Sequence, residues 1–158
     1  MKPDDIEILL VEDSQDDVEL ALHTLRAENL ANRILVARDG AEALDFLFCT
    51  GPHAGRSFDH PPKLVLLDLK LPKVDGMQLL KQMKGDPRTQ HIPVVMMTSS
   101  REERDLVASY ELGVNSYLQK PVDFSEFRTM VKLLGLYWLV INQPPVADHK
   151  SAVAGQKK

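Results

Sequence analysis

Residues 64–68 read Leu64-Val65-Leu66-Leu67-Asp68, an apolar run closed by a carboxylate. The run does not alternate and has no helical period, which is typical of a strand buried on both faces of a sheet. Two further runs have the same form: Ile8 to Val11, followed by Glu12 and Asp13, and Pro93 to Met97, followed by Thr98. The sequence therefore predicts short buried strands, each with a polar group at its carboxyl end.

Stretches with helical periodicity separate these runs. The expected strands are about 7–11, 33–37, 64–68, 92–98 and 116–120, and the expected helices begin at Ser14 and after Asp39-Gly40 and cover about 77–84, 101–112 and 123–141. Strands that alternate with helices usually pair in parallel, so an α/β fold with all carboxyl ends along one edge is predicted. Open α/β sheets bind their ligands at that edge.

The composition excludes several classes of protein. Of the 158 residues, 44% are hydrophobic and 27% charged, which is ordinary for a globular domain. A net charge of −4 provides no basic surface for nucleic acid. The longest unbroken apolar run, 136–141, is far shorter than the ~20 residues of a membrane span. Because there is one cysteine, Cys49, and no signal-peptide pattern, we expect a cytoplasmic location.

The chain is expected to form one domain over residues 1–142, which ends with an extended helix over 123–141. A flexible polar tail is expected over residues 143–158, because Gln143-Pro144-Pro145 ends the helix. Residues 50–62 are rich in glycine and proline and are expected to form a loop. That loop is long compared with the usual ~4–6 residues.

The carboxylates at the strand ends predict a metal site. If Glu12, Asp13 and Asp68 lie within a few ångströms of one another, their charges repel unless a cation lies between them. Mg²⁺ prefers oxygen ligands, keeps several waters and binds one or two carboxylates directly. We expect Asp13 and Asp68 to bind the ion directly, Glu12 to act through water, and a backbone carbonyl to complete the set.

The same groups predict phosphoryl chemistry on Asp68. A carboxylate can form a covalent acyl phosphate, and a metal ion with a fixed cation such as Lys120 stabilises charge on the transferring group. Thr98 offers a hydroxyl to one phosphoryl oxygen. The Lys120–Pro121 bond is expected to be cis, which would direct the lysine back over the strand ends.

These motifs, in this order, resemble the receiver domain of two-component response regulators over about residues 6–134. The resemblance rests on Val11-Glu12-Asp13, Leu67-Asp68-Leu69-Lys70-Leu71-Pro72-Lys73-Val74-Asp75-Gly76, Met97-Thr98-Ser99 and Tyr117-Leu118-Gln119-Lys120-Pro121. It implies a flavodoxin-like, doubly wound sheet of five parallel strands in the order 2-1-3-4-5, with five helices.

The resemblance also implies residue roles. Asp68 would receive phosphate from a kinase phosphohistidine, and Mg²⁺ (or Mn²⁺) would bind Asp13, Asp68 and the Lys70 carbonyl, with Glu12 outside them. The family usually has Asp-Asp where this chain has Glu12-Asp13, so its metal affinity can differ. Thr98 and Tyr117 would form the switch: Thr98 moves toward the phosphoryl group and Tyr117 changes from exposed to buried. The alternative for Tyr117 is an ordinary half-buried strand aromatic.

Two segments are similar to single-domain regulators that partner phytochrome histidine kinases. They are residues 50–56 of the long loop and residues 136–145 at the end of the last helix. This similarity implies that a phytochrome-like kinase supplies the phosphate and that the output is contact with a downstream protein whose identity the sequence does not give.

The last helix has more apolar surface than one buried face requires. Phe127, Val131, Leu134, Trp138 and Ile141 are expected to face the core. Leu133, Leu136, Tyr137 and Val140 remain, and with Trp138 they predict a homodimer interface, because a monomer rarely exposes a large apolar patch. The alternative is a wider buried stripe beneath the tail.

Two other functions compete with the signalling module. A receiver-like scaffold that works without phosphate typically lacks the acceptor or the lysine, whereas this chain has Asp68 and Lys120. An aspartyl-phosphate hydrolase usually has a second aspartate two residues after its nucleophile, where this chain has Lys70. We therefore expect a signalling module whose only reactions are self-phosphorylation and self-dephosphorylation.

Overall fold

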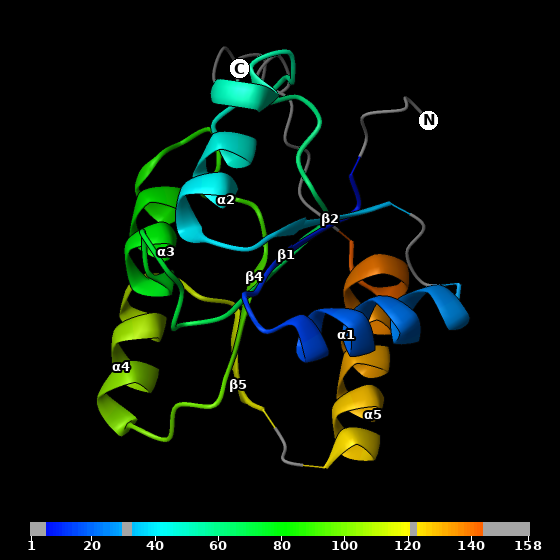
Figure 1. The fold of residues 1–158 in the computed structure, drawn as a ribbon. Helices are drawn as coiled ribbons and strands as arrows, with labels where there is room; N and C mark the ends of the chain where they lie inside the picture. Colours follow the sequence, from blue (N-terminus) through cyan, green and yellow to red (C-terminus); the bar gives the residue numbers. More distant parts are fainter. Residues whose placement is uncertain (1–5, 30–32, 121–122, 144–158) are drawn as a thin grey trace.

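The structure, a computed structural model, describes residues 6–29, 33–120 and 123–143. Its centre is a parallel five-stranded sheet in the order β2-β1-β3-β4-β5, which confirms the doubly wound fold (Figure 1). The strands are β1 (Ile8–Val11), β2 (Ile34–Ala37), β3 (Leu64–Leu67), β4 (Val94–Thr98) and β5 (Ser116–Gln119).

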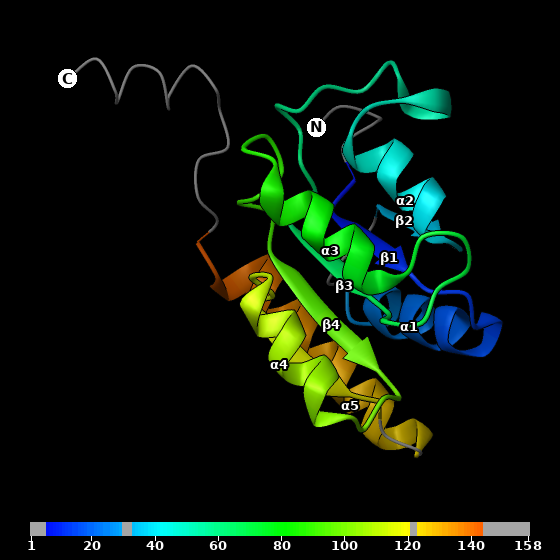
Figure 2. The ribbon, with the colours of Figure 1, turned by 90° about the vertical axis from the view of Figure 1, so that its left-hand side faces the viewer.

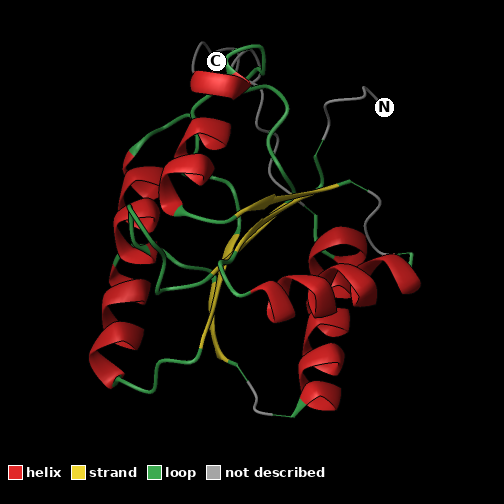
Figure 3. Cartoon of the chain, in the orientation of Figure 1, coloured by secondary structure: helices red, strands yellow, loops and turns green. Residues whose placement is uncertain are grey.

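Five α-helices cover the two faces of the sheet. They are α1 (Gln15–Ala27), α2 (Gly40–Leu47), α3 (Gly76–Gly85), α4 (Glu103–Glu111) and α5 (Phe124–Gly135). Helices α1 and α5 lie on one face, and α2, α3 and α4 lie on the other (Figures 1 and 3). Figure 2 shows α3 and α4 on the second face, with β4 visible between them. None of the helices in the described ranges is long and apolar enough to cross a membrane.

The β3 strand shows why its sequence does not alternate. Leu64 and Leu66 belong to the core beneath α1 and α5, whereas Val65 and Leu67 belong to the core beneath α2 and α3. All four side chains are buried. Successive side chains of a strand point to opposite faces, so a strand covered on both sides needs apolar residues at every position.

Local sequence signals fix where several helices start and stop. Ser14 caps α1 with its side chain, and Asp75 forms a capping box with Gln78 at the start of α3. Gly113 follows α4 with a φ of +99°, a left-handed conformation that favours glycine, as predicted for the end of that helix.

The last helix departs from the prediction of a single α-helix over 123–141. Helix α5 ends at Gly135, and the chain continues as the π-helical segment η2 (Leu136–Ile141). The predicted core stripe was wrong at Ile141, which is 58% exposed, while Trp138 packs on the core. A π-helix does not keep the 3.6-residue period, so the face that holds Trp138 does not continue to Ile141.

The loop over 50–62 contains a 3₁₀ turn, η1 (Gly51–His53), that follows α2. Arg56 secures this loop: its guanidinium lies 3.6 Å from the centroid of the Phe46 ring and donates hydrogen bonds to the carbonyls of Phe46 and His60. The predicted tail falls outside the described residues from 144 onward, so its boundary stays a prediction.

Candidate functional site

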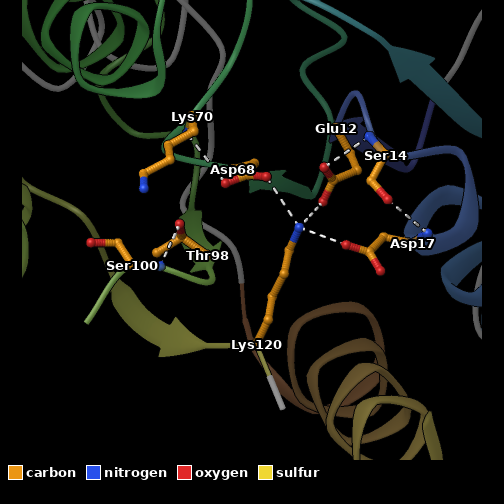
Figure 4. Close-up of polar contacts among 8 residues, drawn as sticks. All are labelled: Glu12, Ser14, Asp17, Asp68, Lys70, Thr98, Ser100 and Lys120. Atoms are coloured by element: carbon orange, nitrogen blue, oxygen red, sulfur yellow. Dashed lines mark hydrogen bonds and ion pairs between the residues drawn. The ribbon is translucent and has the colours of Figure 1, made fainter. Parts of the chain in front are cut away.

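Residues from four strand ends meet at one edge of the sheet. Glu12 and Asp13 follow β1, Asp68 follows β3, Thr98 ends β4 and Lys120 follows β5. The strands pair in parallel, with Val11 opposite Leu67 and Thr98 opposite Gln119, so the carboxyl ends lie level. Figure 4 shows Glu12, Asp68, Thr98 and Lys120 around one centre, as the sequence predicted.

Carboxylate oxygens of Glu12, Asp13 and Asp68 lie within 4.8 Å of one another. Glu12 is 2% exposed and Asp68 9%, whereas Asp13 is open to solvent. Burial, reinforced by the charge of Asp68, raises the pKa of Glu12 to about 7, although a hydrogen bond from Lys120 opposes the rise. Three carboxylates that offer only oxygen ligands fit a hard divalent cation. An open cleft of about 550 Å³ beside Asp13 and Lys70 gives access.

The Lys120 ammonium donates to three carboxylates. It lies 3.1 Å from Asp68 Oδ2 and 2.8 Å from Asp17 Oδ2, and it also pairs with Glu12 Oε1. Burial alone would lower the pKa of Lys120, but hydrogen bonds to Asp17 and Glu12 raise it above the usual value of a lysine. Lys120 is therefore a fixed positive charge beside Asp68. The Lys120–Pro121 bond falls outside the described residues, since Pro121 is not among them.

The main chain after β3 supports the Asp68 side chain. The backbone N–H of Lys70 donates to Asp68 Oδ1 at 3.2 Å, while the Lys70 side chain is exposed. The other carboxylate oxygen, Oδ2, accepts a hydrogen bond from Lys120. The role of the Lys70 carbonyl as a metal ligand stays a prediction.

Thr98 and Tyr117 belong to the neighbouring strands β4 and β5. Thr98 is the last residue of β4, and Tyr117 is the second residue of β5. Thr98 is fully buried, and its hydroxyl accepts from the Ser100 N–H at 3.2 Å. The Tyr117 ring is half-buried, and its hydroxyl oxygen is buried without a hydrogen-bond partner among the described residues. Burial raises the pKa of Tyr117; the nearby Ser100 hydroxyl opposes this rise but donates to Asp105 instead. The switch roles of both residues stay predictions.

Asp17 is the one carboxylate partner of Lys120 that the sequence analysis did not place in the site. By sequence, Asp17 is typical of an acidic residue in the first turn of a helix, where a carboxylate is favoured by the helix dipole. It also follows Asp13 by four residues, one helical turn into α1, and its carboxylate is half-buried. That spacing places Asp17 near the strand end but does not by itself predict the contact with Lys120.

Comparison with known proteins gives one consistent result. Residues 8–132 match the family described as the response regulator receiver domain. The chain is 39% identical to response regulator Rcp1 of Synechocystis sp. over 140 residues, which cover 89% of this chain and 93% of that protein. The crystal structure of the Mn²⁺-bound form of Rcp1 superposes with a TM-score of 0.81, covering 87% of this chain and 97% of that one.

Two other solved structures are similar. The phosphorylated cyanobacterial phytochrome response regulator RcpA is 38% identical with a TM-score of 0.82, covering 87% of this chain and 96% of that one. The bacteriophytochrome response regulator AtBRR is 53% identical with a TM-score of 0.68, covering 89% and 100% of the two chains. With the fold, the strand-end carboxylates and the family match, the chain belongs to the response regulator receiver domain family.

Proposed function

We propose that this chain is a phospho-accepting response regulator that receives a phosphoryl group from a histidine kinase on Asp68. The observation that carries the proposal is the placement of Asp68. Its carboxylate lies in a cluster of carboxylates suited to a divalent cation, and Lys120 lies 3.1 Å from its Oδ2. A nucleophile, a cation site and a fixed ammonium are the groups that phosphoryl transfer to a carboxylate requires.

In the proposed reaction an Asp68 carboxylate oxygen attacks phosphorus as the N–P bond of a kinase phosphohistidine breaks, and the bonding pair stays on the imidazole nitrogen. Asp13, Asp68 and the Lys70 carbonyl would hold Mg²⁺ or Mn²⁺, with Glu12 acting through water, and the bound ion would supply positive charge to the phosphoryl oxygens. Lys120 stabilises the same charge from the β5 side. Water later hydrolyses the acyl phosphate, so the only reactions of the chain are those of its own phosphate.

The proposed response is local and involves Thr98 and Tyr117. Thr98 lies at the end of β4 and carries a buried hydroxyl whose hydrogen can turn toward a phosphoryl oxygen. Movement of Thr98 favours one position of Tyr117 over the other, which changes the surface of α4, β5 and α5. A phosphoryl group shifts the population only as far as it favours one of the two states.

The proposed partner is a phytochrome-like histidine kinase in the cytoplasm. Support comes from the similarity to RcpA and to AtBRR, which are by name response regulators of a cyanobacterial phytochrome and of a bacteriophytochrome. The output is contact with a downstream protein. A phosphate-independent scaffold is the competing function, and no feature of the site favours it.

We also propose a homodimer that uses the last helix. Leu133 is 59% exposed, Leu136 39%, Tyr137 49% and Val140 62%. Trp138 is half-buried: one part of its side chain packs against the core, and the exposed part adds to this apolar patch. A second copy would cover this patch, because large apolar patches are rare on monomers.

The proposal is tested by transfer from a purified phytochrome histidine kinase that carries radioactive phosphate. We expect label to move from the kinase to this chain in the presence of Mg²⁺, and not to the Asp68→Asn variant. Retention of all label on the kinase, while the kinase transfers to its known regulator, would refute the partnership.

A further inference from the structure

Lys120 has no spare hydrogen-bond donor in this structure. An ammonium carries three N–H groups, and the three carboxylates of Glu12, Asp17 and Asp68 each accept one. The Lys120 side chain is 10% exposed, so water cannot easily replace these partners. Any group that approaches Lys120 must take the place of one of the three carboxylates.

The three partners are not equivalent. Glu12 and Asp68 belong to the cluster that fits a divalent cation, whereas Asp17 does not belong to it. Asp17 reaches the ammonium from the first turn of α1, with its Oδ2 2.8 Å from Nζ and its side chain 26% exposed. Figure 4 shows the Lys120 Nζ between the carboxylates of Asp68 and Asp17.

A divalent cation and Lys120 draw on the same two carboxylates. A cation bound to Asp68, with Glu12 reaching it through water, would weaken the attraction of both carboxylates for the ammonium and would repel it. Asp17 is then the carboxylate partner that stays available. Without it, the buried ammonium would be left poorly paired, which is costly.

We propose that Asp17 is a positioning residue: it holds the Lys120 ammonium beside Asp68 when a divalent cation binds the carboxylate cluster of Glu12, Asp13 and Asp68. The inference rests on the proposed function, because it assigns Asp17 a part in preparing Asp68 for the phosphoryl group. Asp17 itself touches neither the cation nor the phosphoryl group.

Asp16 is the matched control. It lies next to Asp17 in the same first turn of α1, carries the same charge and favours the helix dipole equally, but its side chain is exposed and has no contact with Lys120 among the described interactions. The Ser14 cap binds the backbone N–H of Asp17, so a change of the Asp17 side chain leaves the cap in place.

The test compares Asp17→Asn, Asp17→Glu and Asp16→Asn with the unmodified chain. Mn²⁺ binding is measured from the EPR signal of the free ion, and labelling by acetyl phosphate is measured as a function of Mg²⁺. For Asp17→Asn we expect Mn²⁺ affinity to fall about 10-fold, the scale seen for partners of metal ligands, and labelling at saturating Mg²⁺ to slow. Asp17→Glu keeps the charge and should recover part of both. Asp16→Asn should change neither, and melting curves should show all variants folded.

If Asp17→Asn binds Mn²⁺ and is labelled as the unmodified chain is, the proposal is overturned. It is also overturned if Asp17→Asn and Asp16→Asn lose affinity and labelling equally, because equal losses would reflect only the charge at the start of α1. If acetyl phosphate fails to label the unmodified chain, the proposed function fails, and the Mn²⁺ titration alone still decides the role of Asp17. If the unmodified chain is labelled and the two variants do not differ, only the role of Asp17 fails.

Discussion

Gly76, the first residue of α3, lies against the backbone carbonyl of Asp68: a Cβ at position 76 would be 2.4 Å from that oxygen. The same atom would be 2.7 Å from the Cα of Leu69, so backbone rather than a flexible side chain would have to move. The close approach places the start of α3 directly behind the proposed phosphoacceptor.

Gly76→Ala should therefore displace the chain that carries Asp68. We expect a loss of stability of about 1–3 kcal/mol, the usual range for overpacking, and slower labelling by acetyl phosphate. Gly85→Ala is the control, because a Cβ at that last residue of α3 meets nothing within 4 Å. Urea unfolding should show that variant as stable as the unmodified chain or more so. Normal labelling and stability in Gly76→Ala would contradict the account.

The strand ends of the site were predictable, whereas the contact of Asp17 was not. Asp68 and Thr98 each follow an apolar run, Lys120 follows the last expected strand, and parallel pairing brings such positions to one edge whatever lies between them. The contact between Asp17 and Lys120 joins residues 103 positions apart and depends on the direction in which α1 leaves β1. No local pattern encodes that direction.

Arg56 makes several contacts that hold the loop after α2. Arg56 stacks on Phe46 and donates to two carbonyls, so Arg56→Ala should reduce stability by about 2 kcal/mol, the sum expected for a cation–π contact and charged hydrogen bonds. Arg56→Lys should recover only part, because an ammonium lacks the planar fork.

Arg104→Ala is the control for this loop. Arg104 is 83% exposed and pairs with Glu102, a type of surface pair that contributes little. Chemical unfolding followed by circular dichroism compares the three variants. Equal stabilities of Arg56→Ala and Arg104→Ala would show that the loop does not need the Arg56 contacts.

The proposed dimer predicts a localised sensitivity on the last helix. Leu133→Glu and Val140→Glu place charges on the exposed apolar face and should convert a dimer to a monomer in sedimentation velocity. Val107→Glu adds the same charge on α4, where Val107 is 49% exposed, and should leave the dimer intact. A sedimentation profile that stays unchanged in both helix variants would remove the last helix from the interface.

Asp39 should give α2 a pH-dependent stability. Its carboxylate accepts from the Glu42 N–H at 2.8 Å and lies 3.3 Å from Lys73 Nζ, and these contacts hold the pKa of Asp39 below its usual 3.8. A depressed pKa means that the contribution is present above the unfolded pKa and is lost as pH falls through the folded pKa. Asp39→Ala should cost about 1 kcal/mol at pH 7, as loss of an N-cap does.

Urea unfolding at neutral pH and at successively lower pH checks this expectation. The deficit of Asp39→Ala should be constant from neutral pH down to about pH 5 and should shrink below the usual pKa of the carboxyl. Asp39→Asn keeps an N-cap but loses the charge that faces Lys73, so it should lose less stability than Asp39→Ala at neutral pH, and its stability should lack this dependence on pH. A deficit that does not change with pH would show that the charge of Asp39 is not involved.

The end of the last helix shows a second limit of sequence reasoning. The spacing of Val131, Leu134 and Trp138 follows one helical face, and extending it by three residues placed Ile141 in the core. The backbone changes to a π-helix over Leu136–Ile141, and the Asn142 N–H donates to the carbonyl of Tyr137, five residues earlier. The extrapolated helical face is therefore lost. The side-chain pattern gives no sign of that change in hydrogen bonding.

The most direct test of the central claim is incubation of the pure chain with acetyl phosphate and Mg²⁺, followed by intact-mass measurement and borohydride trapping of the acyl phosphate. The account predicts the added mass of one phosphoryl group, located on Asp68, dependent on Mg²⁺ and absent from Asp68→Asn. Addition that persists in Asp68→Asn, or that proceeds equally in the presence of EDTA, would contradict the assignment of Asp68 as a metal-dependent phosphoacceptor.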